Sequence, residues 1–517
     1  MKNRPRSKKL VIARRISQLF FLTLFIYILW STTYPLKGGI SPEIIFRLDP
    51  LIVFLTSLSE RVLLPGTLLS LMMIVLTFVL GRFFCGWVCP LGTLIDGFGA
   101  FRKKKNLFSD ASNRRWRRIK WFLLSAVFLS AVFGMQIAWV LDPMATAARF
   151  VSMNLIPTVT LTVQKIFVGL ITRFELYGGF YDFYRNLQSS VLGVNVYYFS
   201  SSQLIFAFFL AVTASAIALP RLWCRMLCPL GAIYRIAAGK ALMERRLEGC
   251  TNCGVCKSDC RMGAIRDDSG YVKGECILCM DCVYDCPPRG TRFGFSPGQK
   301  RSEEVPGTAA KDRKGAVSRK EFLFLLAASI PFLGGRRRRF RGGAGVSAGT
   351  GGLIRPPGAL PEEAFVDRCV RCGNCMKVCI TNGLQPVMLE SGAGGIWTPQ
   401  LVPEIGYCEY QCTLCGNVCP TGAIPKLAPE VKCRTSLGVA VVEHHACIAW
   451  ANHEECIVCE EHCPVPTKAI KLQEEIYDGR KILKPVVDKD LCIGCGLCQH
   501  VCPVRPVRAI RVRGAER

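Results

Sequence analysis

The spacing of the cysteines constrains this chain more than any other feature of its sequence. The chain has 29 cysteines among 517 residues, and 24 of them form six groups of four. Most groups follow the spacing C-x2-C-x2-C-x3-C, and four of the six are followed directly by proline. A disulfide framework is typical of short secreted chains with irregular spacing. The repeated pattern instead predicts small modules whose thiolates ligate metal.

The six groups lie in two parts of the chain. The first part carries two regular groups: Cys250, Cys253, Cys256, Cys260 and Cys276, Cys279, Cys282, Cys286. The second part carries four groups: Cys369, Cys372, Cys375, Cys379; Cys408, Cys412, Cys415, Cys419; Cys447, Cys456, Cys459, Cys463; and Cys492, Cys495, Cys498, Cys502. The group before Cys463 is irregular. We assign Cys447 to it rather than Cys433, because Cys447 lies nearer, and Cys433 is then a spare thiol.

This spacing is that of [4Fe–4S] ligands in two-cluster ferredoxins. Three thiolates on a tight loop bind three irons of one cube, and the fourth reaches the neighbouring cluster. We therefore expect Cys286 to complete the cluster of the Cys250 group, and Cys260 that of the Cys276 group. Zinc also uses C-x2-C pairs, but four cysteines in one run with a trailing proline favour a cube. The chain should bind about six clusters, and the spacing leaves open which cysteines cross over between residues 369 and 502.

Apolar runs near the amino terminus predict about four transmembrane helices, at roughly 17–34, 65–84, 119–140 and 203–222. Basic clusters flank these runs, which indicates that the amino terminus lies in the cytoplasm of a bacterium whose inner membrane holds the chain. The same placement argues against nucleic acid as the reason for the net charge of +28, since no aromatic-rich binding motif accompanies it. An aromatic insert at 174–199 should lie outside.

The membrane region contains an internal repeat. Leu-Asp-Pro occurs at residues 48–50 and 141–143, and Cys-x3-Cys-Pro-Leu-Gly occurs at 85–92 and 224–231. A helical Cys-x3-Cys places both thiols on one face. Four thiols could therefore converge and bind a soft metal or a cluster, or act as a redox dithiol; buried packing of the repeat is the alternative. They are Cys85, Cys89, Cys224 and Cys228.

Histidine placement limits the cofactors of the membrane region. All five histidines lie beyond residue 440. A b-type haem held by two histidines inside the membrane is therefore excluded. Electrons that cross the membrane would use the cysteine sites, quinone or another cofactor.

Composition divides the chain into four domains. Residues 1–240 form the transmembrane domain, 241–298 a cytoplasmic domain for two clusters, 299–359 a linker, and 360–517 a domain for four clusters. Within the linker, residues 318–323 followed by an apolar run to Leu333 resemble a twin-arginine export signal, and a short anchor is the alternative. The predicted fold class is an all-α membrane bundle carrying α+β ferredoxin-like domains.

These motifs support a family resemblance. Residues 10–297, with paired C-x3-C-P-L-G motifs and a two-cluster ferredoxin, resemble the NapH family of membrane iron–sulfur proteins. Residues 315–517 resemble NapG and MauM, exported four-cluster ferredoxin-type proteins. The resemblance implies a fusion of the two that acts as a quinol dehydrogenase module, takes electrons from the quinol pool and passes them to a periplasmic cytochrome or reductase. The carboxy-terminal domain would then be periplasmic.

Three functions fit the sequence. The first is quinol-linked electron transfer, with Asp49 and Asp142 as candidates for handling quinol protons or as simple helix caps. The second is a metal-handling assembly factor that uses the membrane thiols. The third is a cytoplasmic polyferredoxin relay without a quinone site. The sequence identifies no catalytic residue.

Overall fold

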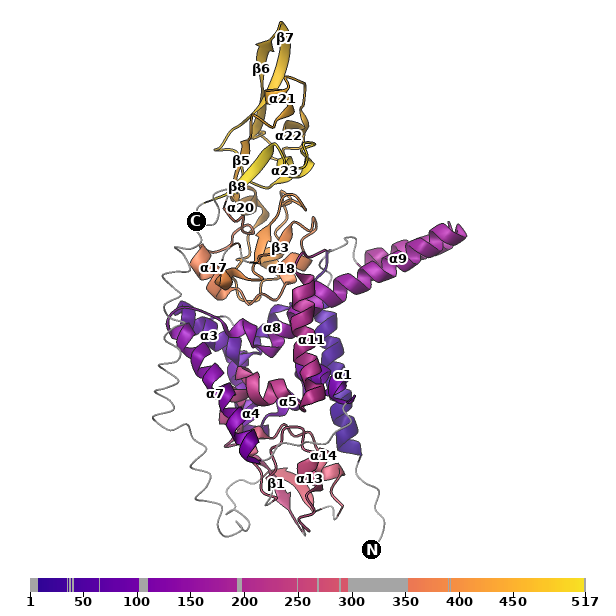
Figure 1. Ribbon diagram of the computed structural model, residues 1–517, viewed down its shortest axis with the longest axis vertical. Helices are drawn as coiled ribbons and strands as arrows, with labels where there is room; N and C mark the ends of the chain where they lie inside the picture. The colour runs from indigo at the N-terminus through magenta and orange to yellow at the C-terminus, as the bar shows by residue number, and fades with distance from the viewer. Residues whose placement is uncertain are drawn as a thin grey trace. The chain divides into compact units, whose positions relative to one another are not determined.

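Helices dominate the chain up to α12 (Pro229–Ala238), and short helices alternate with strands after it (Figure 1). The computed structural model describes residues 8–34, 36, 39, 41–64, 66–101, 110–192, 198–248, 250–266, 269–287, 290–295, 352–388, 390 and 392–515. The predicted export-signal segment, Ser318 to Leu333, lies outside these residues. The chain divides into two units, and each is described by itself.

The first unit comprises Met1–Tyr27, Ile44–Ala148 and Phe206–Gly334. It holds most of the apolar helices together with one cysteine-rich module. Its helices are α1 (Lys9–Trp30), α2 (Glu43–Arg47), α3 (Pro50–Glu60), α4 (Thr67–Leu80), α5 (Phe83–Trp87), α6 (Pro90–Gly99), α7 (Asp110–Val132), η1 (Ala138–Val140), α8 (Pro143–Phe150), α11 (Ser202–Ala218), η4 (Trp223–Leu227), α12, α13 (Val255–Ser258), η5 (Lys273–Glu275) and α14 (Asp281–Tyr284). Strands β1 (Met243–Leu247) and β2 (Thr291–Phe295) pair antiparallel and bring the two ends of the module together.

The two Cys-x3-Cys-Pro motifs do not form continuous α-helices as predicted. In the first copy α5 ends at Trp87, and Cys89 is the N-cap of α6. In the second copy the first cysteine lies in the π-helix η4, and Cys228 is the N-cap of α12. The physical reason is the proline after each second cysteine, since proline disfavours helical backbone at the residue before it but is well suited to the first helical position.

The second unit comprises Ile28–Glu43, Arg149–Ile205 and Gly335–Arg517. Its helices are η2 (Val151–Leu155), α9 (Ile156–Phe174), α10 (Gly179–Leu187), η3 (Gln188–Leu192), α17 (Glu362–Arg368), α18 (Asn374–Lys377), η7 (Ala393–Gly395), α19 (Leu414–Asn417), α20 (Pro429–Cys433), α21 (Ile448–Ala451), α22 (Val458–Glu461) and α23 (Leu497–Val501). Its strands are β3 (Leu384–Pro386), β4 (Pro399–Leu401), β5 (Gly438–Val442), β6 (Ile470–Tyr477), β7 (Arg480–Val487) and β8 (Ile510–Gly514).

Cysteines form part of the hydrophobic core in this unit. The strands pair antiparallel as β3–β4, β5–β8 and β6–β7, each in a two-stranded sheet. One core cluster joins apolar side chains such as Phe365 and Met376 to cysteines of all four groups. Sheets of two strands offer little apolar surface. Ligand binding at the cysteines should therefore supply much of the folding free energy.

Among the residues that the structure describes, two helices are long and apolar enough to cross a membrane. They are α1 and the continuous helix Pro143–Phe174, formed by α8, η2 and α9. The helices at two other predicted spans, α4 and α11, have 14 and 17 residues and are shorter than the roughly 20 residues that a bilayer requires. The long helix was not predicted as a span. Polar residues such as Asn154 interrupt its apolar run, and the predicted external insert, 174–199, begins only where this helix ends.

Candidate functional site

Three cavities in the second unit are each lined by four cysteines. Each lining set combines three cysteines of one group with the last cysteine of another. The sets are Cys369, Cys372, Cys375 with Cys419; Cys408, Cys412, Cys415 with Cys379; and Cys447, Cys456, Cys459 with Cys502. Each cavity therefore offers four thiols to one cofactor.

The remaining cysteines of this unit follow the same arrangement. Cys495 interacts electrostatically with Cys492 and with Cys463, which is the last cysteine of the irregular group. Cys433 does not line any of the three cavities, and its thiol lies 3.4 Å from the carbonyl oxygen of Tyr410. The structure therefore brings together Cys447 with Cys456 and Cys459, as the sequence predicted, and leaves Cys433 outside.

The donor sets fit a cluster better than a single ion. Within the described residues, no group of three or more His, Cys, Asp or Glu side chains is arranged to hold one metal ion. The thiols instead surround cavities in sets of four, and a [4Fe–4S] cluster would take one thiolate on each of its four irons. Burial, together with the neighbouring thiols, raises the pKa of Cys375 and Cys415 well above the ordinary value. These thiols should therefore lose their protons when iron binds.

The cavity sets predict which cysteine pairs share a cluster. Cys419→Ala should remove one cluster, and Cys369→Ala should remove the same one. The double variant should then lose no more iron and sulfide than either single variant, whereas Cys419→Ala combined with Cys408→Ala should lose two clusters. Iron and sulfide analysis of the purified protein measures this. Cys433→Ala is the control and should keep full iron; equal losses in the two double variants would contradict the crossed sets.

The cysteine module of the first unit shows one crossed set. Cys260 interacts electrostatically with Cys276, Cys279 and Cys282. This is the exchange that the spacing predicted. In the other group, Cys256 lies beside Cys250 and Cys253, which are exposed. Arg245 Nη2 is 3.3 Å from the Cys256 Sγ, and hydrogen bonds to ligand sulfurs tune a cluster's reduction potential.

The loop from Cys276 to Cys279 packs directly on the first Cys-x3-Cys motif. Trp87 Nε1 donates a hydrogen bond of 3.0 Å to the carbonyl oxygen of Leu278. Gly86 approaches so closely that a Cβ there would overlap the carbonyl oxygen of Ile277. This helix position therefore requires glycine.

A buried ion cluster joins the same module to the helices. Glu275 precedes the ligand Cys276 and is completely buried. Its carboxylate pairs with Arg82 at 3.0 Å, Lys120 at 2.5 Å and Arg235 at 2.6 Å. Burial alone would raise the pKa of Glu275, but the surrounding cations, Lys120 foremost, lower it to about 2. The carboxylate is therefore ionised at neutral pH.

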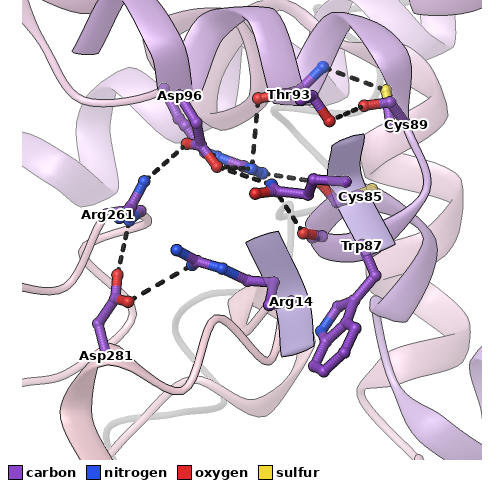
Figure 2. Close-up of polar contacts among 12 residues, drawn as sticks. Arg14, Cys85, Trp87, Cys89, Thr93, Asp96, Arg261 and Asp281 are labelled. Carbon is purple, nitrogen blue, oxygen red and sulfur yellow. Dashed lines mark hydrogen bonds and ion pairs between the residues drawn. The ribbon is translucent and has the colours of Figure 1, made fainter. Parts of the chain in front are cut away.

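A second ion network lies near the first Cys-x3-Cys motif (Figure 2). Arg261 bridges Asp96, at 3.2 Å, and Asp281, at 2.6 Å. Arg14 pairs with Asp281 at 3.5 Å, and Arg221 pairs with Asp96 at 2.7 Å. Although burial opposes ionisation, Arg221 and Arg261 hold the pKa of Asp96 well below its usual range. Helices α1 and α6 are thus tied to the loops that carry Cys260 and Cys282.

The repeat arginines cross over between the two motifs. Arg82 and Arg221 each stand three residues before the first cysteine of their own copy, and both are buried. Arg221 Nη1 donates to the carbonyl oxygen of Cys85 at 2.8 Å. Arg82 lies against Gly231 of the other copy, so closely that a Cβ there would be 2.6 Å from its Nη2. Arg221 therefore binds the partner motif, and Arg82 packs against it.

The structure brings the four thiols of the two Cys-x3-Cys motifs together. All four are buried, and Cys228 interacts electrostatically with Cys224, Cys85 and Cys89. The thiols of Cys89 and Cys228 each accept a hydrogen bond from the glycine N–H three residues later, at 3.4 and 3.3 Å. The two copies therefore have matching local geometry. Whether these thiols bind metal or exchange electrons stays a prediction.

Several functional residues were not predicted from sequence. Glu275, Asp96, Arg82 and Arg221 look like ordinary surface charges when read along the chain. The repeat alignment gives one signal, since both arginines occupy the same position in the two copies. Their carboxylate partners have no such signal, because Arg82 and Glu275 are 193 residues apart.

Comparisons with known proteins agree with this chemistry. The family described as "4Fe-4S binding domain" matches residues 63–107 and 202–248, and the family described as "4Fe-4S dicluster domain" matches residues 454–505. The methylamine utilization ferredoxin-type protein MauM of Methylorubrum extorquens is 38% identical over 162 residues, which are 31% of this chain and 71% of that protein. The ferredoxin-type protein NapG of Escherichia coli is 35% identical over 158 residues, 30% of this chain and 67% of that protein. No solved structure matches.

The crossed cysteine sets and these similarities both indicate that the chain binds [4Fe–4S] clusters. The two relatives are covered over two thirds or more of their length, and the matched families bind [4Fe–4S] clusters. Such clusters carry single electrons. The chain therefore belongs, through about a third of its length, to the ferredoxin-type family of MauM and NapG, and it is an iron–sulfur electron-transfer protein.

Proposed function

We propose that this chain is a membrane-bound electron-transfer protein that passes electrons from quinol through about six [4Fe–4S] clusters to a periplasmic cytochrome or reductase. The observation that carries the proposal is the packing of the Cys276–Cys279 loop on Gly86 and Trp87. A cluster-binding loop is thereby fixed to the region that holds the apolar helices. Electrons can move between that region and the cluster without diffusion of a soluble carrier.

We infer that the membrane domain has four spans, as the resemblance to NapH implies, which include α1 and α7 and extend beyond the ends of the shorter helices α4 and α11. Apolar side chains on these helices are exposed, including Leu19 and Phe20 on α1, Leu68 and Val75 on α4, and Phe128 on α7. Exposed apolar surface of this extent requires a nonpolar environment. The helix Pro143–Phe174 is a further candidate for membrane contact.

Contacts within the first unit support a cytoplasmic position for its cluster module. The module pairs with Arg14, Lys120 and Arg235. Arg14 and Lys120 belong to basic clusters that flank apolar segments, and Arg235 follows the last one. Basic residues beside spans mark the cytoplasmic side.

Contacts within the second unit support a periplasmic position for its four-cluster domain. Lys377 donates to the carbonyl oxygen of Leu29 near the end of α1, and Lys426 pairs with Glu43 at 2.8 Å. Gln385 donates to the carbonyl oxygen of Tyr198 at 3.0 Å. Leu29 lies in the second half of the first predicted span, Glu43 follows that span, and Tyr198 belongs to the predicted external insert. The domain thus contacts the segments expected outside.

The test measures both the side of the membrane on which the carboxy terminus lies and the reduction of the clusters by quinol. A protease added to intact spheroplasts should cleave a tag at the carboxy terminus, and a quinol analogue should reduce the clusters in the same membranes. A protected tag would favour the cytoplasmic relay. No reduction by quinol, with normal reduction by dithionite, would overturn the quinol-linked function.

A further inference from the structure

The two Leu-Asp-Pro copies of the repeat place their aspartates side by side. Asp49 and Asp142 are 1% and 0% exposed. Asp49 Oδ1 accepts from the backbone N–H of Leu51 at 2.8 Å, and Asp142 Oδ2 accepts from that of Ala145 at 2.6 Å. Each aspartate therefore caps the helix that follows it with one carboxyl oxygen.

The two carboxyl groups interact with each other, and each affects the ionisation of the other. Their remaining oxygens, Asp49 Oδ2 and Asp142 Oδ1, are buried and have no hydrogen-bond partner among the described residues. Two neighbouring buried carboxylates cannot both be charged at moderate cost. We therefore expect the pair to hold one proton.

Helix capping alone does not explain this pair. Asparagine caps a helix about as well as aspartate and carries no charge. Two neighbouring aspartates in a buried site need a proton to avoid two adjacent charges, whereas two asparagines would cap the same helices without one. The arrangement is instead that of carboxyl pairs that share, gain and lose protons.

A tyrosine connects the pair to the membrane thiols. Tyr234 of α12 is 0% exposed, and its hydroxyl has no hydrogen-bond partner. It interacts electrostatically with Asp49 and Asp142 and also with Cys85 and Cys89. Its ring lies 5.6 Å from that of Phe84, centroid to centroid. Among the described residues, Tyr234 is the ionisable group shown to interact with both the pair and the thiols.

We propose that the Asp49–Asp142 pair accepts the protons released when quinol is oxidised, with Tyr234 as a positioning residue between the pair and the thiols. This inference rests on the proposed function. One quinol gives up two electrons and two protons and becomes quinone. The electrons reduce two [4Fe–4S] clusters by one electron each. The pair, which holds one proton at rest, accepts the two protons one after the other and releases each to bulk water.

Asparagine variants test the pair without removing the caps. Membranes carrying Asp49→Asn or Asp142→Asn should show quinol-driven cluster reduction slowed by at least about 100-fold, the usual contribution of a positioned acid or base. Reduction by dithionite should not change, which shows that the clusters are present. Asp182→Asn, the same change at an exposed site on α10, is the control and should behave as the unchanged protein. Tyr234→Phe should slow the reaction by a smaller factor.

Infrared spectroscopy separates this inference from the proposed function. A buried protonated carboxyl gives a C=O band that shifts in D2O, and that band should change in either asparagine variant of the full-length protein. Quinol reduction at the normal rate in both variants, or a band unchanged in both, would overturn the inference while the quinol function stands. If quinol does not reduce the clusters of the unchanged protein, the proposed function fails. Loss of the C=O band in the asparagine variants would then still show that the pair holds a proton.

Discussion

Glu275→Gln should destabilise the first unit by about 3–5 kcal/mol, the usual cost of breaking a buried ion pair from one side. The variant keeps the shape of the side chain but leaves Arg82 and Lys120, both completely buried, without their carboxylate. Thermal unfolding of the detergent-solubilised protein should shift to lower temperature. The electron paramagnetic resonance signal of the cluster next to Cys276 should weaken first.

Glu248→Gln is the matched control for this experiment. Glu248 lies in the same module and pairs with Arg292 at 3.5 Å, but both side chains are more than half exposed. Exposed pairs contribute less than about 1 kcal/mol, so this variant should unfold as the unchanged protein does. Equal shifts in the two variants would show that the ion cluster around Glu275 does not hold the module.

Gly86→Ala should displace the Cys276–Cys279 loop and cost at least about 1–3 kcal/mol, as overpacking of a well-packed site does. The new methyl group would overlap the backbone carbonyl of Ile277, which cannot rotate away as a flexible side chain could. The cluster of the Cys276 group should be lost or altered, and its resonance signal reports this directly.

Gly97→Ala provides a comparison of opposite sign. Gly97 lies within α6, and a Cβ there meets nothing within 4 Å. Helix propensity favours alanine over glycine by up to about 1 kcal/mol, so Gly97→Ala should be neutral or stabilising. If Gly86→Ala behaves in the same way, the contact between loop and motif is looser than the structure shows.

The cysteine pattern carried most of the information about the candidate sites. The spacing predicted the groups, the place of Cys447 and the exchange of Cys260, because each group is local in sequence, and the structure brings these cysteines near one another. The exchange of Cys379 with Cys419 was not predictable. It depends on which groups lie beside each other in space, and four groups in succession permit several arrangements.

The membrane region was predicted less completely because its key contacts are long-range. The repeated Leu-Asp-Pro segments drew attention to Asp49 and Asp142, but their mutual contact needed coordinates. Glu275 offered no signal at all, since a charged residue in a polar module looks solvated. The long helix Pro143–Phe174 was missed because local polarity at Asn154 broke an apolar pattern.

The exchange of last cysteines has a consequence for how the protein responds to iron supply. In each exchanging pair, each loop provides a ligand to its neighbour's cluster, so neither loop can complete a site alone. Filling one site fixes the loop that the other needs, which makes the second filling easier. When iron is scarce, a population of chains should therefore divide into modules that are fully loaded and modules that are empty. Half-filled modules, which would interrupt electron transfer at one cluster, should therefore be rarer than independent filling of the sites would give.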